Sequence, residues 1–117
     1  SIPVLRQNNN YPFKTSANHK WLVATEGDEV KGFMPVEIKK AGACIDNYHV
    51  PGDNSTLLAA LIDFAKKEFT ENQPLFVVSH ARDAEVFRTN GFTVFKEWKL
   101  YVKMVYSPAY ENQKECV

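Results

Sequence analysis

The sequence predicts one α/β (α+β) domain in which two helices cover a mixed, mostly antiparallel sheet, in the order β-β-β-α-β-α-β. Three patterns support this fold class. Short runs rich in β-branched and aromatic residues recur along the chain, one long segment has apolar residues at helical spacing, and an apolar run follows that segment directly. A helix that connects two strands of one sheet implies a parallel pair, and such crossovers are right-handed.

The first three predicted strands lie in the N-terminal half of the chain. Residues 21–25 (WLVAT) suit a pleated, half-buried surface, and a Gly-Asp turn follows them. Glu29–Lys39 alternates imperfectly, and Pro35 inside it lacks a ladder donor, which predicts an edge position or a bulge. Residues 44–50 are predicted to form a buried strand that stops at Pro51.

The second half of the chain predicts the helices and the remaining strands. A long amphipathic helix opens at Thr56, and Asn54 or Ser55 supplies the N-cap oxygen. The later elements are a buried strand at residues 75–78, a short helix at residues 81–89, and a long final strand or bent pair at residues 92–106.

The 117 residues are enough to bury one core without a disulfide or a metal. Residues 1–18 are expected to form an irregular arm with Val4, Leu5 or Phe13 at the core, residues 19–107 the domain, and residues 108–117 a mobile tail. The two cysteines, Cys44 and Cys116, fit neither a disulfide framework nor zinc-site spacing. A reducing cytoplasm is the simplest location.

Charge and hydropathy exclude several classes of partner. The chain has 14 Lys and Arg against 14 Asp and Glu, so its composition indicates neither a nucleic-acid track nor an anionic membrane surface. A ferredoxin-like nucleic-acid binder is the rival topology, but it calls for a basic, aromatic sheet face that the sequence does not provide. No apolar run approaches the roughly 20 residues of a spanning helix, and the N-terminus lacks a signal-peptide layout.

The segment from residue 43 to residue 69 has the order strand, tight loop, helix. The first backbone N–H groups of a helix have no internal partner and carry partial positive charge, so this order makes an anion site. Phosphate is the usual ligand of such a site. A plain, well-capped core helix is the alternative.

Five segments carry a resemblance that runs from about residue 20 to residue 106: WLVATEGDEVKGF, CIDNYHVP, STLLAALIDFAKKEF, LFVVSHARDAEVFRTNGF and YVKMVY. In order and spacing they resemble the GCN5-related N-acetyltransferase (GNAT) superfamily of acyl-CoA-dependent acyltransferases. In that family a splayed strand pair holds the pantetheine arm, and the loop before the helix binds the pyrophosphate. The resemblance implies acetyl-CoA, or another acyl-CoA, as cofactor, held by Tyr48, His49, Val50, Gly52, Asn54, Ser55, Thr56 and Phe87.

The chain departs from the family pattern in three places. The loop VPGDNSTLL lacks the family's Arg and paired glycines, and Asp53 adds negative charge near a phosphate. Phe87 stands where the family often has a proton-donating Tyr, and His80 stands where it often has an Asn facing the cofactor. Residues 1–18 do not supply the family's usual N-terminal strand and helices. The acceptor site is therefore open, or a further segment or a second chain, as in a homodimer, completes it.

His80 and Asp46 are the catalytic candidates. A His at a strand end in a cleft can act as general acid or base near neutral pH, and a purely structural, hydrogen-bonded His is the alternative. Asp46 and Asn47 lie where the family often has a base or a strand-splaying bulge, and simple solvent exposure is the alternative.

Four other residues have two interpretations each. Tyr48 and Tyr101 can donate protons from the sheet or serve as core aromatics. Ser55 can cap the helix or contact a phosphate with the same geometry. Cys44 is expected to be a small buried hydrophobe, because nothing basic beside it would lower its pKa.

Two functions fit these residues. The first is an acyl-CoA-dependent N-acyltransferase, with acetyl as the expected group and an amine-bearing small molecule or protein as acceptor. The amine would lose a proton and attack the thioester carbonyl in the strand gap, while backbone N–H groups of residues 48–50 stabilise the oxyanion. The second is a non-catalytic binding or regulatory module that kept the fold but lost the phosphate loop and the Tyr.

Overall fold

The computed structural model describes residues 3–7, 18–52 and 54–107. The predictions for Phe13, Asp53, Cys116 and the tail lie outside these ranges. The strands are β1 (Val4–Gln7), β2 (His19–Glu26), β3 (Glu29–Lys39), β4 (Gly42–Ile45), β5 (Leu75–His80), β6 (Thr93–Glu97) and β7 (Tyr101–Tyr106). The helices are α1 (Ser55–Phe69) and α2 (Ala84–Thr89), and a 3₁₀ turn, η1 (Ala81–Asp83), precedes α2.

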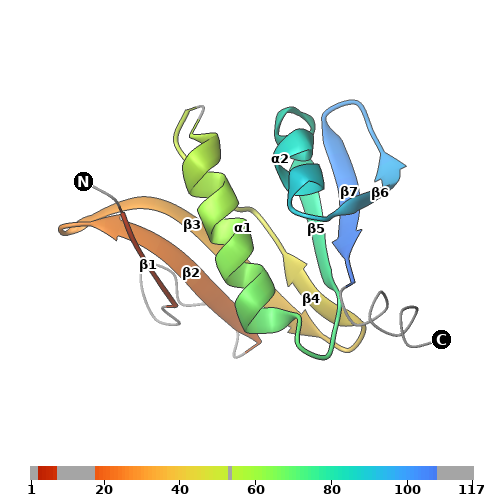
Figure 1. The fold of residues 1–117 in the computed structure, drawn as a ribbon, viewed down its shortest axis with the longest axis horizontal. Coiled ribbons are helices and arrows are strands. Elements are labelled where there is room, and N and C mark those ends of the chain that lie inside the picture. The colour runs from red at the N-terminus through yellow and green to blue at the C-terminus, as the bar shows by residue number, and fades with distance from the viewer. Residues whose placement is uncertain (1–2, 8–17, 53, 108–117) are drawn as a thin grey trace.

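The described strands form one seven-stranded sheet in the order β1-β2-β3-β4-β5-β7-β6 (Figure 1). Strands β4 and β5 are parallel, and every other neighbouring pair is antiparallel. This confirms the predicted mixed, mostly antiparallel sheet with two helices. Two details add to it: β1 pairs with β2 inside the arm predicted to be irregular, and the last strand is a bent pair, β6 and β7.

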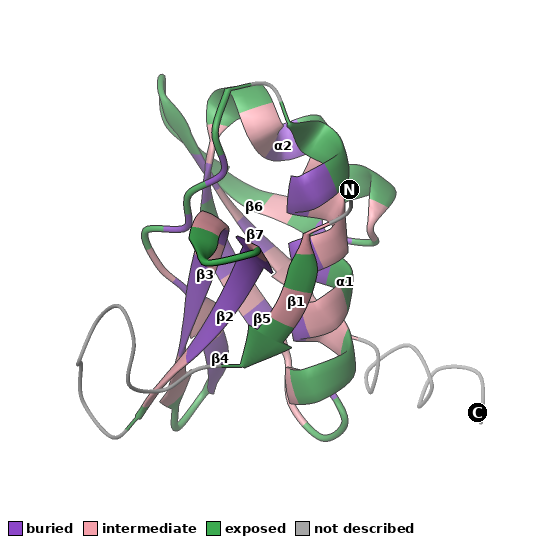
Figure 2. Cartoon of the chain, turned by 90° about the vertical axis from the view of Figure 1, so that its left-hand side faces the viewer, coloured by how far each residue is buried: buried purple, intermediate pink, exposed green. Residues whose placement is uncertain are grey.

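Helix α1 lies across one face of the sheet and forms the core with it (Figures 1 and 2). The Asn54 side chain accepts a hydrogen bond from the Leu57 N–H at 3.0 Å, which confirms one of the two predicted N-caps. The buried helix residues are Leu57, Leu58, Leu61, Ile62 and Ala65. They pack on alternate residues of the central strands, among them Leu22, Met34, Val36 and Ile45. No helix in the described ranges combines the length and apolarity that a bilayer crossing requires.

The strand predicted at residues 44–50 ends early, at Ile45. Asn47 adopts a left-handed backbone with φ of 47°, a conformation that Asn tolerates better than most residues. The N–H of Asp46 bonds to the Pro35 carbonyl, and the N–H of His49 bonds to the Phe33 carbonyl. The chain thus advances three residues here while β3 advances two, and the extra residue makes a bulge. A bulge therefore lies at Asp46 and Asn47.

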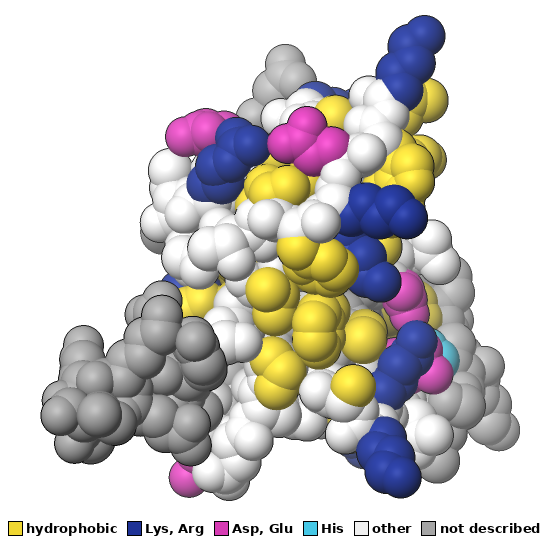
Figure 3. Space-filling model, turned by 90° about the vertical axis from the view of Figure 1, so that its right-hand side faces the viewer, with side chains coloured by type: hydrophobic (Ala, Val, Ile, Leu, Met, Phe, Trp, Pro, Cys, Tyr) yellow, Lys and Arg dark blue, Asp and Glu magenta, His cyan; other side chains and the backbone are white. Residues whose placement is uncertain are grey.

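The last two strands leave apolar side chains exposed. Trp98 and Leu100 lie in the turn between β6 and β7 and are 47% and 65% exposed. Figure 3 views this end of the molecule and shows hydrophobic side chains gathered there with Lys and Arg side chains beside them. The bend of the predicted bent pair falls at this turn, and the apolar residues of the turn continue the period-2 pattern of the strands.

Candidate functional site

Strands β4 and β5 separate into a wedge at the centre of the sheet. They are in register only from Ala43 opposite Leu75 to Ile45 opposite Val77. Beyond that point the chain after β4 pairs with β3, through Asp46 N–H to the Pro35 carbonyl and a two-way bond between Phe33 and His49. Strand β5 continues for three more residues and pairs on its other side with β7. Beyond Ile45 and Val77, the chain after β4 and the end of β5 therefore pair with β3 and β7, and not with each other.

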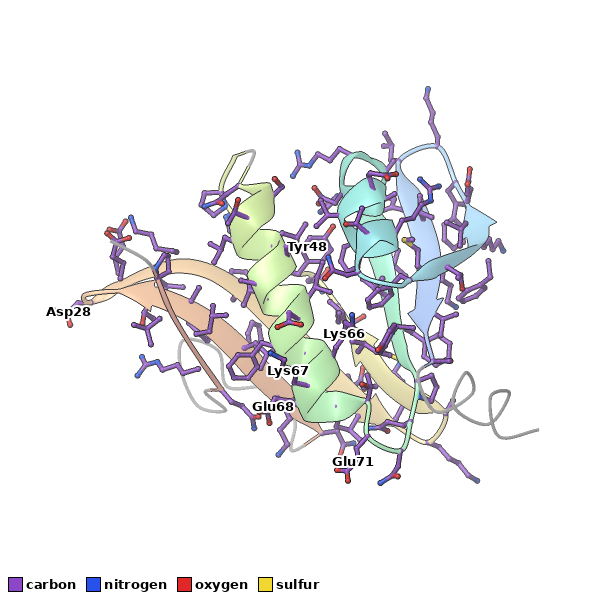
Figure 4. The ribbon with its side chains drawn as sticks, in the orientation of Figure 1. Asp28, Tyr48, Lys66, Lys67, Glu68 and Glu71 are labelled. Atoms are coloured by element: carbon purple, nitrogen blue, oxygen red, sulfur yellow. The ribbon has the colours of Figure 1, made fainter. Side chains whose placement is uncertain are left out.

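Tyr48 bridges the wedge. Its hydroxyl donates to the Asp83 carboxylate at 2.7 Å and accepts from the backbone N–H of His80 at 3.0 Å. Its ring is buried and contacts Phe87 edge-on, with ring centroids 5.7 Å apart. Figure 4 shows Tyr48 between α1 and α2. One side chain from the bulge therefore joins the end of β5 to the turn that starts α2.

Burial sets the protonation state of this tyrosine. Removal from water raises the pKa of the Tyr48 hydroxyl, and its hydrogen bond to Asp83 raises it further, because both favour the neutral form. Tyr48 therefore keeps its proton throughout the physiological range. The proton points toward Asp83, and the oxygen remains the acceptor for the N–H of His80.

A cavity of about 250 Å³ lies at the N-terminus of α1, and we call it the helix-end cavity. Its lining comes from the loop before α1, the first turns of α1, and the η1–α2 segment: Val50, Gly52, Asn54, Ser55, Leu58, Arg82, Asp83 and Val86. Gly52 has φ of 56°, and a Cβ there would meet no atom within 4 Å, so the loop leaves open space. Among the described residues, no recorded hydrogen bond uses the N–H of Ser55 or Thr56.

Arg82 supplies the positive charge that the loop lacks. It lines the helix-end cavity from η1, and its side chain is 72% exposed. Its Nε lies 4.0 Å from Asp83 Oδ1, so it has a loose ion pair and a largely free guanidinium edge. Sequence reasoning missed Arg82 and Asp83, because they follow β5 and reach the α1 terminus only through the fold.

A second cavity, of about 160 Å³, lies in the wedge, and we call it the wedge cavity. It is lined by Ile45, Asp46, Asn47, Tyr48, Val78, His80 and Tyr101. The His80 ring lies between two tyrosines, with centroids 5.4 Å from Tyr48 and 5.5 Å from Tyr101. The structure therefore brings both catalytic candidates, Asp46 and His80, to one cavity. The Tyr48–Asp83 hydrogen bond joins this cavity to the helix-end cavity.

Of the eight residues that the resemblance assigned to the cofactor, Tyr48 lines the wedge cavity, and four line the helix-end cavity: Val50, Gly52, Asn54 and Ser55. Three lie elsewhere. His49 is exposed, its backbone is bonded to Phe33, and its ring lies 5.6 Å from the Phe33 ring. Thr56 lines a shallow groove between α1 and α2, and Phe87 is fully buried in the core.

Cys44, expected to be a buried hydrophobe, is half-buried on β4 and carries a free thiol. Burial raises the pKa of this thiol, and the nearby Asp46 and Glu37 carboxylates raise it too, against an opposing effect from Lys39. The thiol therefore stays protonated near neutral pH. It does not have the electropositive surroundings of a reactive cysteine.

Comparison with known proteins gives a likeness of structure. No family model matches the sequence, and no curated protein matches it. A GNAT family acetyltransferase from Elizabethkingia anophelis, solved with acetyl-CoA bound, has a TM-score of 0.65 at 11% identity, over 91% of this chain and 98% of that chain. ElaA from Escherichia coli has a TM-score of 0.64 at 12% identity, over 79% of this chain and 70% of its own.

A third similar structure is the PaiA N-acetyltransferase from Thermoplasma acidophilum in complex with coenzyme A. Its TM-score is 0.56 at 19% identity, over 77% of this chain and 61% of that chain. Identities this low carry the likeness of fold and nothing finer. The fold they show is that of the GNAT N-acetyltransferases, as the sequence resemblance predicted.

Proposed function

We propose that this protein is an acyl-CoA-dependent N-acyltransferase that transfers an acyl group, acetyl in the simplest case, to an amine. The observation that carries the proposal is the wedge: a cavity at a helix N-terminus and a cavity holding Asp46 and His80 meet at one hydrogen-bonded tyrosine. The acceptor is an amine-bearing small molecule or protein. We place the reaction in the cytoplasm, which suits the free thiol of Cys44.

The residues around the helix-end cavity fit the phosphates of an acyl-CoA. The N–H groups of Ser55 and Thr56 open α1, where the helix dipole favours an anion, and Arg82 lines the same cavity with a positively charged side chain. Guanidinium groups bind phosphate oxygens through paired, charge-assisted hydrogen bonds. Arg82 thus compensates for the Arg and glycines that the loop lacks.

The backbone beside the wedge fits an acyl group and its developing charge. In the described part of the chain, no recorded hydrogen bond uses the N–H of Tyr48 or Val50. Such N–H groups can stabilise the oxyanion that forms when an amine attacks a carbonyl. Acyl-CoA, when bound, supplies the activated thioester whose C–S bond breaks as the new C–N bond forms.

Asp46 and His80 line the wedge cavity and are the groups placed to take the amine proton. An ammonium acceptor must lose a proton before it can attack, and a neutral His or an ionised Asp can accept it. Phe87 has no proton to give, and Tyr48 holds its proton toward Asp83. The ammonium loses one proton before the attack and a second as the C–N bond forms; the base passes one of them to the departing sulfur, and the other leaves to water.

The experiment is a thiol-release assay with acetyl-CoA and a panel of amines, from polyamines and amino sugars to lysine peptides. We expect amine-dependent release of free CoA, and a fall of at least about tenfold in kcat for His80→Asn, in line with the usual contribution of general acid–base catalysis. Glu71→Gln, which changes an exposed residue after α1 (Figure 4), is the control and should leave the rate unchanged. Unchanged turnover in His80→Asn would remove His80 from the chemistry.

A non-catalytic GNAT-fold module is the second candidate, and one observation favours it. The N–H of His80 in the wedge already donates its hydrogen bond to the Tyr48 hydroxyl, and Phe87 stands in place of the family's proton-donating Tyr. A module of this kind would bind acetyl-CoA, or a different ligand, without amine-dependent release of CoA. Binding without turnover across the amine panel would support it.

A further inference from the structure

We propose that His19, Glu37 and Asp46 form a binding site for one divalent transition-metal ion, with Zn²⁺ as the best-fitting ion. The inference does not depend on the proposed transferase activity. It concerns the sheet face opposite α1, next to the wedge cavity, and its readout is metal binding. The three residues come from β2, from β3 and from the bulge after β4.

The strand register brings the three side chains together. His19 lies directly opposite Glu37 in the β2–β3 ladder. The N–H of Asp46 bonds to the carbonyl of Pro35, which lies two residues before Glu37 on β3. Glu37 alternates with Val36 and Ile38, which pack in the core under α1, so its side chain points to the other face. One ligand atom from each residue, the imidazole nitrogen and two carboxylate oxygens, lies within 4.8 Å of both others.

The set of donor atoms selects the class of ion. One imidazole and two carboxylates are ligands that zinc and similar transition ions accept, whereas Mg²⁺ and Ca²⁺ prefer oxygen ligands alone. Tetrahedral zinc bonds of about 2.0–2.2 Å place neighbouring ligand atoms about 3.3–3.6 Å apart. His19 Nε2 is already 3.8 Å from Glu37 Oε1, so modest side-chain rotations would close the set around an ion.

Charge and exposure favour a cation at this place. Two carboxylates converge here, and Lys39 Nζ, at 3.7 Å from Glu37 Oε1, gives partial compensation from a side chain that is 53% exposed. That ammonium can swing into solvent when an ion arrives. His19 and Glu37 are 22% and 27% exposed, which leaves an entry path while removing part of their hydration. Three protein ligands leave a fourth position for water.

The sequence did not reveal this site because its ligands lie on β2, on β3 and in the bulge after β4. Zinc motifs are recognised when ligands recur at short, fixed spacings, and these three residues are far apart in the chain. Only the pairing of β2 with β3, and the bulge after β4, places them side by side. The spacing of the cysteines has no part in the site.

The test is isothermal titration of the metal-free full chain, without a histidine tag, with Zn²⁺. We expect one equivalent to bind and to raise the melting temperature, because the ion binds only the native arrangement. Glu37→Gln, Asp46→Asn and His19→Gln should each weaken Zn²⁺ binding by at least about tenfold, since loss of an outer-shell partner alone costs that much. Mg²⁺ should bind far more weakly.

Two controls separate this site from other metal binding. Asp28→Asn repeats the Asp46 substitution at the exposed tip of the β2–β3 hairpin (Figure 4) and should bind Zn²⁺ as the wild type does. Cys44→Ser tests a thiol opposite Glu37 in the β3–β4 ladder and should also leave binding unchanged. Circular dichroism without metal confirms that each variant folds.

The proposal is overturned if Zn²⁺ does not bind one to one. It is also overturned if folded Asp46→Asn or His19→Gln binds as tightly as Asp28→Asn, or if only Cys44→Ser abolishes binding. His19 lies at the start of β2 and Asp46 lies just after the end of β4, so at least one of their two variants is expected to fold even if Glu37→Gln proves unstable.

Discussion

Tyr48 is the residue that connects the two sides of the wedge. Its hydroxyl is shared between the Asp83 carboxylate and the N–H of His80, both of which lie beyond the end of the β4–β5 ladder. The sequence placed Tyr48 near the cofactor and left open whether it was a proton donor or a core aromatic. It is a buried aromatic whose hydroxyl supports the site, and this dual role depends on residues that are distant in the sequence.

Replacing Tyr48 with Phe should destabilise the protein by about 1–3 kcal/mol, because the N–H of His80 and the Asp83 carboxylate would each lose a partner. Urea denaturation measures the change. Tyr101→Phe is the matched control: Tyr101 is 44% exposed, and no recorded hydrogen bond of the described residues uses its hydroxyl, so the change should stay within about 0.5 kcal/mol. Equal effects of the two substitutions would contradict this role of Tyr48.

The same hydroxyl predicts a pH dependence with a definite sign. The pKa of Tyr48 is raised in the folded state above the 10.0 of a free tyrosine, so the native state favours the protonated form. Its contribution is fully present below pH 10 and declines above it, because the unfolded chain loses the proton first. The stability advantage of wild type over Tyr48→Phe should shrink by up to about 1.4 kcal/mol per pH unit above that point. An advantage that grows with pH would have the wrong sign.

Arg82 is expected to carry much of the charge recognition in the helix-end cavity. Arg82→Gln should weaken acetyl-CoA binding by about three- to tenfold and reduce the salt dependence of the affinity, since an exposed guanidinium is partly screened. Arg88→Gln is the matched control, because Arg88 lies on α2 in an exposed pair with Glu85 and does not line that cavity. Identical affinities for the two variants would exclude Arg82 from the binding site.

At the scale of elements, the wedge depends on how β4 and β5 begin. Gly42 opens β4 with φ of 149°, and a Cβ there would lie 2.7 Å from the Pro74 carbonyl oxygen. The N–H of Ala43 donates to that same carbonyl at 3.0 Å. Added bulk therefore strains the first contact of the parallel pair, from which the wedge opens.

Gly42→Ala should cost about 3 kcal/mol or more, from overpacking and a weakened hydrogen bond. Gly27→Ala is the comparison, because Gly27 has φ of 62° in an open turn with no atom within 4 Å of a new Cβ. It should cost only about 1 kcal/mol, the usual left-handed penalty. Thermal or urea denaturation of both variants decides the order, and a Gly27→Ala variant less stable than Gly42→Ala would contradict it.

The elements that the sequence predicted well are those with strong local patterns. The amphipathic spacing and Asn54 cap of α1, and the bounds of Glu29–Lys39, follow from residues close in sequence. The early end of β4 and the short strand β1 were missed, because a bulge and an edge pairing depend on the neighbouring strand. The alternation through Trp98 left a long strand and a bent pair both open, because exposed apolar residues in a turn mimic a strand pattern.

At the scale of the molecule, the candidate site was partly predictable. Asp46, His80 and the α1 terminus follow from the order of strand, loop and helix, and the fold places them around one wedge. Arg82 and the His19 cluster were not predictable, because each is assembled by tertiary pairing between distant segments. The fold thus supplies charge that the loop sequence lacks, and this is the main reason to expect that acyl-CoA binds.

That expectation is the central claim, and a thermal-shift titration with acetyl-CoA tests it most directly. A ligand that binds only the native state must raise the melting temperature, by an amount that grows with its concentration over the dissociation constant. We predict a concentration-dependent rise for the wild type that is smaller for Arg82→Gln and unchanged for Arg88→Gln. A melting temperature that stays constant up to millimolar acetyl-CoA would contradict the account.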